Sequence, residues 1–206
     1  MERCTRLDLL RHGACRDGAI YRGRTDSELS EDGWQQLLYA TADGGWDRIF
    51  CSPLKRCRVF AEALAVRLQR PLAIREGLAE LDFGFWDGQP LAEVWSRQSE
   101  AVMAFWRDPV TYPPPGGENM ADLQQRALAV VETLYRDHPG ERLLLITHSG
   151  VIRVLLAHWL EMPLANSQRL AIDYAGCSRV ECYSEGDQLT GIEVRFVNRI
   201  TESMGG

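Results

Sequence analysis

Strand and helix signals alternate along most of this chain, and this alternation constrains the fold more than any other feature of the sequence. The most apolar run, Leu143 to Ile146, is typical of a strand that is covered on both faces. Leu7 to Leu10 is a second run of this kind. Strands that alternate with helices favour a largely parallel sheet between two helical layers. We therefore predict a three-layer α/β fold with a mostly parallel sheet and helices on both faces.

Individual strands and helices are predicted from apolar spacing and from the residues that begin or end helices. Strands are expected at Leu7 to Leu10, Arg48 to Cys51, Pro71 to Arg75 and Leu143 to Ile146. Helices are expected from Ser30 through Leu38, from Ser52 to about Leu68, from Leu91 to Trp106, from about Asn119 to Arg136 and from Ser149 to Trp159. Ser52 suits an N-cap and Pro53 suits the first helical position.

The C-terminal stretch and one internal region depart from this alternation. Arg169 to Val197 contains three short alternating runs, which predict strands at the sheet edge, with the last pair a hairpin. The prolines and glycines of Tyr112 to Gly117 predict an irregular segment, since proline lacks an amide donor. We expect one domain over residues 1–206, with a small lid inserted at about 82–125. The chain of 206 residues is long enough for one sizeable core with a modest insertion.

Composition excludes several classes of partner. The formal net charge is −6 and Lys and Arg do not cluster, which argues against nucleic acid and anionic membranes as partners. There is no apolar signal core and no run of the ~20 apolar residues that a membrane span requires. The six cysteines lack the spacing of a zinc site. We expect a soluble cytoplasmic protein with reduced thiols, no metal and no cofactor.

Polar side chains follow three of the predicted strands directly. Arg11-His12-Gly13 comes after Leu7 to Leu10, Ser52 to Arg56 follows the second strand, and Thr147 to Gly150 follows the most apolar one. Open parallel sheets bind ligands beyond the carboxyl ends of their strands, so these segments are expected to converge. Two arginines and two histidines meeting there suit a phosphoryl group, because guanidinium forks grip its oxygens. An imidazole can attack phosphorus.

These segments, together with Glu80 in Glu-Leu-Asp-Phe-Gly-Phe-Trp-Asp-Gly, resemble the histidine phosphatase superfamily with its phosphoglycerate-mutase-like fold over nearly the whole chain. The resemblance implies that His12 is the nucleophile that becomes phosphohistidine. It also implies that Arg11 and Arg56 bind the phosphoryl group, that a cationic His148 holds it, and that Glu80 is the proton donor. It implies a phosphoric monoester hydrolase that needs no metal.

Other matches to that family are less complete. The resemblance makes Arg22, Arg24, Glu118 and Ser149 candidate contacts of a small-molecule phosphate ester, with Glu118 positioning substrate or holding the lid. Solvated loop arginines explain Arg22 and Arg24 equally well. Cys15 and Gly18 stand where the family often has polar residues, so this loop is expected to make fewer phosphate contacts.

The length and the Thr-His-Ser-Gly-Val-Ile-Arg segment resemble the α-ribazole phosphatases of cobalamin synthesis, which implies α-ribazole 5′-phosphate as substrate. The aromatic residues of the lid would accept its flat base, although core packing explains most of them as well. A broad-specificity sugar-phosphate or phosphoglycerate phosphatase or mutase, and a phosphoprotein phosphatase, are the alternatives. A noncatalytic phospholigand-binding protein is the alternative of another class. An edge strand or the lid is a candidate surface for a homodimer.

Overall fold

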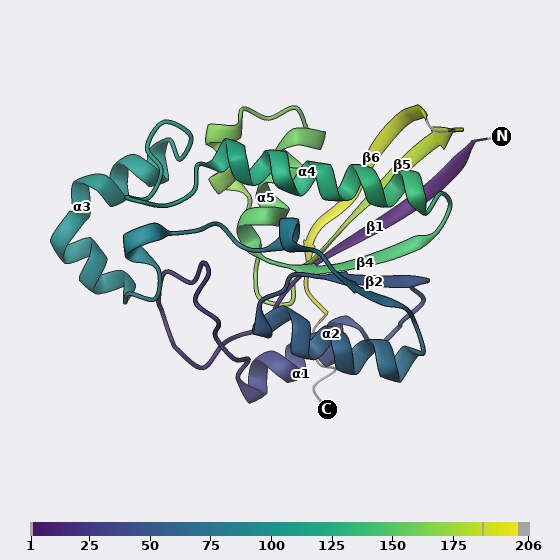
Figure 1. The fold of residues 1–206 in the computed structure, drawn as a ribbon, viewed down its shortest axis with the longest axis horizontal. Coiled ribbons are helices and arrows are strands. Elements are labelled where there is room, and N and C mark those ends of the chain that lie inside the picture. Colours follow the sequence, from purple (N-terminus) through teal and green to yellow (C-terminus); the bar gives the residue numbers. More distant parts are fainter. Residues whose placement is uncertain (1, 187, 202–206) are drawn as a thin grey trace.

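The structure, a computed structural model, describes residues 2–186 and 188–201, and in these residues six strands form one sheet in the order β3-β2-β4-β1-β5-β6 (Figure 1). The strands are β1 (Arg3–Arg11), β2 (Arg48–Cys51), β3 (Leu72–Ile74), β4 (Arg142–Thr147), β5 (Cys177–Glu185) and β6 (Gln188–Arg199). The first four strands are parallel, and β5 and β6 extend the sheet antiparallel beside β1. The predicted mostly parallel sheet is therefore confirmed.

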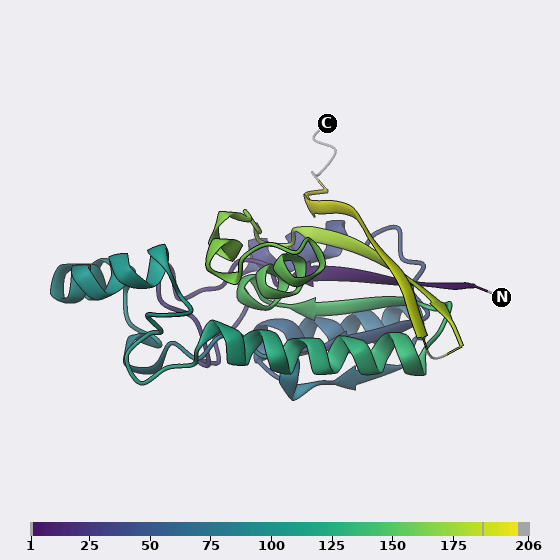
Figure 2. The same cartoon turned by 90° about the horizontal axis from the view of Figure 1, so that it is seen from above.

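Helices cover both faces of this sheet, as expected for three layers. α1 (Glu31–Ala40) and α2 (Lys55–Leu68) lie on one face, and α4 (Met120–Asp137) and α5 (Ser149–Trp159) lie on the other. α3 (Leu91–Arg107) projects beyond the end of the sheet, together with the loops around it (Figures 1 and 2). The helix expected from Ser30 has Ser30 as its N-cap, since the hydroxyl of Ser30 accepts from the N–H of Gly33 at 3.0 Å.

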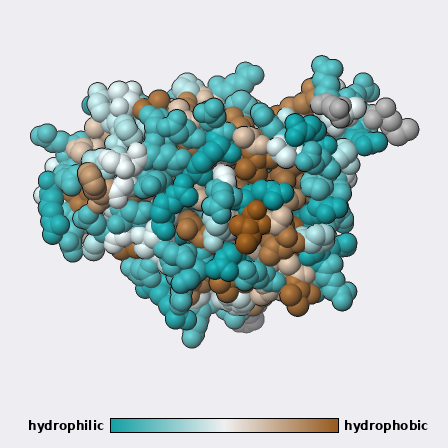
Figure 3. Space-filling view, viewed as in Figure 1, coloured by the Kyte–Doolittle hydropathy of each residue, from teal (hydrophilic) through white to brown (hydrophobic). Residues whose placement is uncertain are grey.

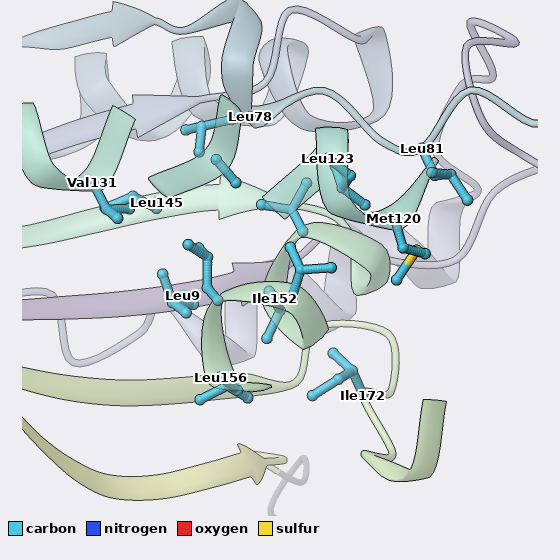
Figure 4. Close-up of a cluster of buried hydrophobic side chains, with 14 of the residues drawn as sticks. Leu9, Leu78, Leu81, Met120, Leu123, Val131, Leu145, Ile152, Leu156 and Ile172 are labelled. Atoms are coloured by element: carbon cyan, nitrogen blue, oxygen red, sulfur yellow. The ribbon is translucent and has the colours of Figure 1, made fainter. Parts of the chain in front are cut away.

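The side chains of β4 show why the sheet needs a helical layer on each face. Leu143 and Leu145 belong to the core on the α4 and α5 side, whereas Leu144 and Ile146 belong to the core on the α1 and α2 side. Successive side chains of a strand point to opposite faces, so four consecutive aliphatic residues fill both cores. Each such burial contributes roughly 1.5–3 kcal/mol. Figure 4 shows Leu145 in the first of these cores with side chains of α4 and α5.

The predicted start of α2 was wrong. α2 begins at Lys55, and Leu54 occupies the N-cap position without a side-chain hydrogen bond. Ser52 instead extends the line of β2, where its N–H donates to the carbonyl of Ile146 at 3.0 Å. This pairing continues the β2–β4 contact through Ser52, and its hydroxyl accepts from the N–H of Leu54 at 3.3 Å, before α2 begins.

The C-terminal stretch contains two of the three expected strands. β5 and β6 pair as predicted, and residue 187 of their connection lies outside the described residues. Leu164–Arg169 is a 3-10 helix, and the next run, 170–175, has no strand. The carbonyls of this run accept instead from arginine side chains, including Arg11 at Ile172 and Arg153 at Leu170. The third expected strand is therefore absent from this described run, and its carbonyls at Leu170 and Ile172 bond to side chains rather than to a neighbouring strand.

The lid region consists of loops, a short 3-10 helix (Gly84–Trp86) and α3. Asn119 is the N-cap of α4, so residues 120–125 of the expected insertion belong to a helix that covers the sheet. None of the described helices combines the length and apolarity that a membrane crossing requires. The face in Figure 3 is mostly hydrophilic, with small apolar patches.

Candidate active site

The two strand-end histidines meet beside each other. Arg11 and Thr147 are partners in the parallel register of β1 and β4, so the residues that follow them, His12 and His148, leave the sheet together. The N–H of His12 donates to the carbonyl of Thr147 at 2.9 Å. The two imidazole centroids are 5.3 Å apart with an interplanar angle of 62°. The convergence expected from strand ends is present.

His12 has one ring nitrogen engaged and the other free. Its Nδ1 lies 2.8 Å from the carbonyl oxygen of Gly13, and since a carbonyl only accepts, Nδ1 carries the proton. The Nε2 lone pair is therefore available. Burial, followed by the charges of Arg56 and Arg11, holds the pKa of His12 well below its usual 6.5. The imidazole is thus neutral near pH 7, the state required for nucleophilic attack.

His148 has the opposite tautomer. The Nε–H of Arg56 donates to its Nδ1 at 3.2 Å, so the proton of the neutral ring is on Nε2, which donates to the hydroxyl of Ser52 at 2.7 Å. Burial and the Arg56 charge lower the pKa of His148 well below 6.5. His148 is therefore neutral in the unliganded protein, and the cationic His148 that the resemblance implies for the bound phosphoryl group stays a prediction. A positively charged His148 ring would be buried away from water and next to the positive guanidinium of Arg56, and both effects disfavour that charge.

Arg56 is fully buried and does not reach the cavity in front of His12. Its guanidinium donates to the carbonyls of Gly23 at 2.7 Å and Thr25 at 2.8 Å. Through these contacts Arg56 orients His148 and fixes the loop after β1. Its positive charge also lowers the pKa of both histidines. The sequence pattern placed Arg56 correctly near the histidines and did not reveal these contacts.

Arg11 has a buried nitrogen without a partner. One of its terminal nitrogens donates to the carbonyl of Ile172 at 2.7 Å, and its guanidinium lies 4.0 Å from the ring centre of Tyr174. Within the described residues, its Nε is buried and makes no hydrogen bond. A buried donor left without a partner is costly, and an incoming anion would satisfy it.

Glu80 lies against the N-terminus of α5. Its carboxyl accepts from the N–H of Gly150 at 3.2 Å and from that of Leu81 at 2.9 Å, and 5% of the residue is exposed. Gly150 allows this approach, because a Cβ there would overlap the carboxyl group. The main chain of Glu80 is held by Arg126, which donates to its carbonyl at 2.9 Å.

Glu118 fixes the main chain around Glu80 through its contacts with Arg126 and with the N–H of Asp82. Its two oxygens lie 2.6 and 2.8 Å from nitrogens of Arg126, and it also accepts from the N–H of Asp82. Burial alone would raise the pKa of Glu118, but the hydrogen bond and charge of Arg126 lower it overall. Of the two roles expected for Glu118, the structure favours holding the lid segment, since Glu118 does not line the cavity.

A cavity of about 310 Å³ opens in front of His12. Its wall contains the predicted residues Arg11, His12, Arg22, Glu80 and Ser149, as well as Arg153, Tyr174, Phe83, Leu91, Trp106 and residues 18–21. Arg24 is exposed and outside this wall; its N–H donates to Asp87.

Sequence reasoning placed Ser52 correctly at a converging strand end but interpreted it as a helix cap, and it missed two residues of this region, Arg153 and Tyr174. Arg153 was part of a quoted motif, and its distance of four residues from Ser149 places both on one face of α5. Tyr174 lies in the run that was expected to be a strand.

The two departures from the family pattern have structural explanations. Burial raises the pKa of the Cys15 thiol despite the surrounding arginines, and Cys15 lies 3.7 Å from the carbonyl of Gly13 as a weak donor. Gly18 has a φ of 68°, and its carbonyl accepts from Arg22 at 2.7 Å. This loop therefore uses backbone geometry to place Arg22 at the cavity. Within residues 2–186 and 188–201, no group of three or more potential metal ligands occurs.

The family model of the histidine phosphatase superfamily (branch 1) matches residues 7–195. This chain belongs to the histidine phosphatase superfamily. The match includes both histidines, Arg11, Arg56 and Glu80, in agreement with the resemblance stated from the motifs.

Several curated relatives of this superfamily member can be compared. A bifunctional protein of Mycobacterium tuberculosis is 32% identical over 95% of this chain and 54% of its own length, so the chain spans about half of that relative. Glucosyl-3-phosphoglycerate phosphatase of the same organism is 32% identical over 80% of the chain and 79% of that protein. The adenosylcobalamin/alpha-ribazole phosphatase of Salmonella typhimurium is 28% identical over 84% of the chain and 87% of that protein.

A solved structure of the mycobacterial glucosyl-3-phosphoglycerate phosphatase contains inorganic phosphate. It is 27% identical to this superfamily member and superposes with a TM-score of 0.81, covering 95% of this chain and 98% of the other. The α/β fold with a mostly parallel sheet is therefore the fold of these relatives.

Proposed function

We propose that the chain is a phosphomonoesterase that works through a phosphohistidine at His12. The observation that carries this proposal is the state of the His12 ring, which is neutral, oriented by Gly13 through Nδ1, and beside a cavity lined by Arg11 and Glu80. A free imidazole nitrogen next to an unsatisfied guanidinium donor suits attack on a phosphoryl group. The phosphate-bound structure of a relative supports the same ligand class.

In the first step, Nε2 of His12 attacks phosphorus, and the bond between phosphorus and the ester oxygen breaks. Glu80 in its protonated form gives its proton to the leaving oxygen. Arg11 contributes its free Nε–H to the phosphoryl oxygens, and buried Arg56 offsets their charge from behind. The departing alcohol leaves through the cavity.

In the second step, water attacks the phosphorus of phosphohistidine, and the carboxylate of Glu80 accepts a proton from that water. The bond between phosphorus and Nε2 breaks and inorganic phosphate is released. His12 returns to its neutral state with Nδ1 still donating to Gly13. His148 remains next to His12 with Nε2 donating to Ser52, and the low pKa of both rings avoids two adjacent positive charges.

For the alcohol part of the ester we propose α-ribazole, as the Thr-His-Ser-Gly-Val-Ile-Arg motif suggests. Trp106, Phe83 and Tyr174 in the cavity wall support a flat, largely apolar leaving group. The similarity to the Salmonella enzyme is consistent with this choice.

A second candidate has an acidic alcohol part, of the phosphoglycerate type. Arg153 lines the cavity and donates through Nε to the carbonyl of Leu170 at 2.9 Å, while its terminal nitrogens have no hydrogen bond within the described residues. A guanidinium of this kind suits a carboxylate. The mycobacterial relative named for glucosyl-3-phosphoglycerate is consistent with this alternative.

The test is a panel of α-ribazole 5′-phosphate, glucosyl-3-phosphoglycerate, 3-phosphoglycerate and sugar phosphates, ranked by kcat/KM. His12→Ala is expected to abolish turnover and the trapping of an acid-labile phosphoenzyme, whereas His158→Ala, at an exposed position of α5, keeps both. Full activity of His12→Ala would overturn the mechanism. No turnover of any ester, including p-nitrophenyl phosphate with and without chelator, would favour the phospholigand-binding alternative.

A further inference from the structure

An apolar groove on the lid continues the cavity in front of His12. The groove has a volume of about 310 Å³ and is lined by Tyr21, Leu91, Ala92, Trp95, Val102 and Trp106. Three of these residues, Tyr21, Leu91 and Trp106, also line the cavity of the candidate active site. The two hollows therefore share a wall, and a ligand whose phosphate lies near His12 can extend into the groove.

The groove follows one face of α3. Leu91 and Trp95 are four positions apart, and so are Val102 and Trp106, which places the two members of each pair on the same side of their helical segment. α3 is interrupted between these pairs at Gln98, with φ −140° and ψ 37°. The side-chain oxygen of Gln98 accepts from Nε1 of Trp86 at 2.9 Å, and Trp86 is fully buried. The interruption of α3 is therefore anchored to the core.

Tyr21 is buried against Phe83 and Trp86, whereas the two tryptophans of the groove are largely exposed, although Trp106 also packs edge-to-face on Phe105. Trp95 is 51% exposed and Trp106 is 45% exposed, and Leu91 between the cavity and the groove is 40% exposed. Neither hydrolytic step proposed above uses them. Large flat apolar side chains at the rim of a binding cavity are suited to stack on a ring of the ligand.

We infer that this groove is the subsite for a flat, apolar ring system carried by the alcohol part of the phosphate ester. The inference rests on the proposed function and adds the surface that selects the substrate. The phosphate lies at His12 and Arg11, the ester oxygen at Glu80, and the ring extends past Tyr21 and Trp106 to Trp95. The class of substrate is thus a phosphate ester of a ring-bearing primary alcohol, such as a nucleoside with a bicyclic base.

The experiment compares ribose 5-phosphate and α-ribazole 5′-phosphate, two esters in which the leaving oxygen belongs to the primary 5-hydroxyl of ribose and which differ in the base. For the wild-type protein, kcat/KM is expected to be at least about tenfold higher with the base, since stacking on an aromatic residue contributes that much or more. Trp95→Ala is expected to bring this ratio close to 1 and to leave kcat/KM for ribose 5-phosphate within about twofold of the wild type.

The matched control is Met103→Ala, on the same helix, 52% exposed and outside the groove. It is expected to retain the preference for the base. Hydrolysis of ribose 5-phosphate by the wild type without any gain from the base would overturn the inference together with the choice of α-ribazole, and leave the phosphohistidine mechanism standing. No hydrolysis of either ester would overturn the inference, and absence of turnover with every ester of the panel would overturn the proposed function as well. If Trp95→Ala keeps the wild-type ratio of kcat/KM between the two esters, the subsite is overturned. If in addition the wild type sediments as a dimer and Trp95→Ala as a monomer, the groove is a contact between copies of the chain.

Discussion

The Nε–H of Arg56 donates to Nδ1 of His148 at 3.2 Å, so a side chain of α2 decides which nitrogen of a strand-end histidine carries the proton. The other nitrogen of His148 then donates to Ser52 at 2.7 Å. Two segments that are distant in the sequence, one with Ser52 and Arg56 and the other with His148, are joined in this way next to His12. The tautomer and the position of the second histidine therefore depend on this guanidinium, whereas the neutral charge of His148 follows first from burial and then from the charge of Arg56.

Replacing Arg56 tests this dependence. Arg56→Lys keeps the charge but loses the fork that reaches His148 and the carbonyls of Gly23 and Thr25 together. We expect a loss of about 1.5–3 kcal/mol in the free energy of unfolding, typical of losing a charge-assisted hydrogen bond. Misplacement of the histidine is expected to lower kcat/KM by about 100-fold. Urea denaturation and steady-state kinetics measure the two effects.

The control for that substitution is Arg58→Lys on the same helix, which pairs with partly exposed Glu62. A change within about 0.5 kcal/mol is expected there. Equal losses in both variants would show that Arg56 has no special role at His148.

Acid is expected to destabilise the protein through its buried histidines. The pKa of His12 and of His148 lies well below 6.5 in the folded state, so the unfolded chain binds their protons first as the pH falls. The free energy of unfolding therefore decreases as the pH falls below about 6.5, by at most about 1.4 kcal/mol per pH unit for each histidine. Chemical denaturation at a series of pH values measures the slope.

His148→Gln should make this dependence shallower, because one buried titrating ring is removed. His158→Gln, at an exposed position of α5, should keep the wild-type slope. A slope that is the same in all three proteins would show that buried His148 is not a source of the acid sensitivity.

Gly150→Ala is predicted to displace the Glu80 carboxyl group, because the added methyl group would overlap it. Loss of alignment between proton donor and ester oxygen is expected to lower kcat by about 100-fold. KM changes little, since the phosphate contacts of Arg11 remain. Gly191→Ala in β6 meets only Tyr183 at 3.8 Å and serves as the control that keeps kcat unchanged.

Glu118→Gln tests whether Glu118 holds the lid segment rather than binding substrate. The pair with Arg126 is mostly buried, with 14% of the Glu118 side chain exposed, so we expect a loss of about 1.5–3 kcal/mol in stability. KM should stay near the wild-type value. Glu93→Gln, in an exposed pair with Arg97, should change stability by at most about 0.5 kcal/mol. A large rise in KM with unchanged stability would assign Glu118 to the substrate instead.

Much of the fold followed from local patterns. The boundaries of β2 and α5 agree with the predicted ones, and those of α3 and α4 differ by one residue at their ends. Apolar spacing and helix caps act between near neighbours, so the sequence carries them directly. The start of α2 failed for the converse reason, since the backbone of Ser52 pairs with the distant strand β4.

The sequence by itself determined that His12, Ser52 and His148 follow the ends of strands in a mostly parallel sheet, because apolar runs and their ends are local patterns. Only the tertiary structure decided that the strands of the two histidines are neighbours. It also decided the protonation of the histidines, the unpartnered nitrogen of Arg11, the contacts of Ser52, and the places of Arg153 and Tyr174. The groove along α3 was likewise decided only by the tertiary structure. These features arise from burial and from hydrogen bonds between residues far apart in the chain, and neither burial nor such contacts can be read from local spacing.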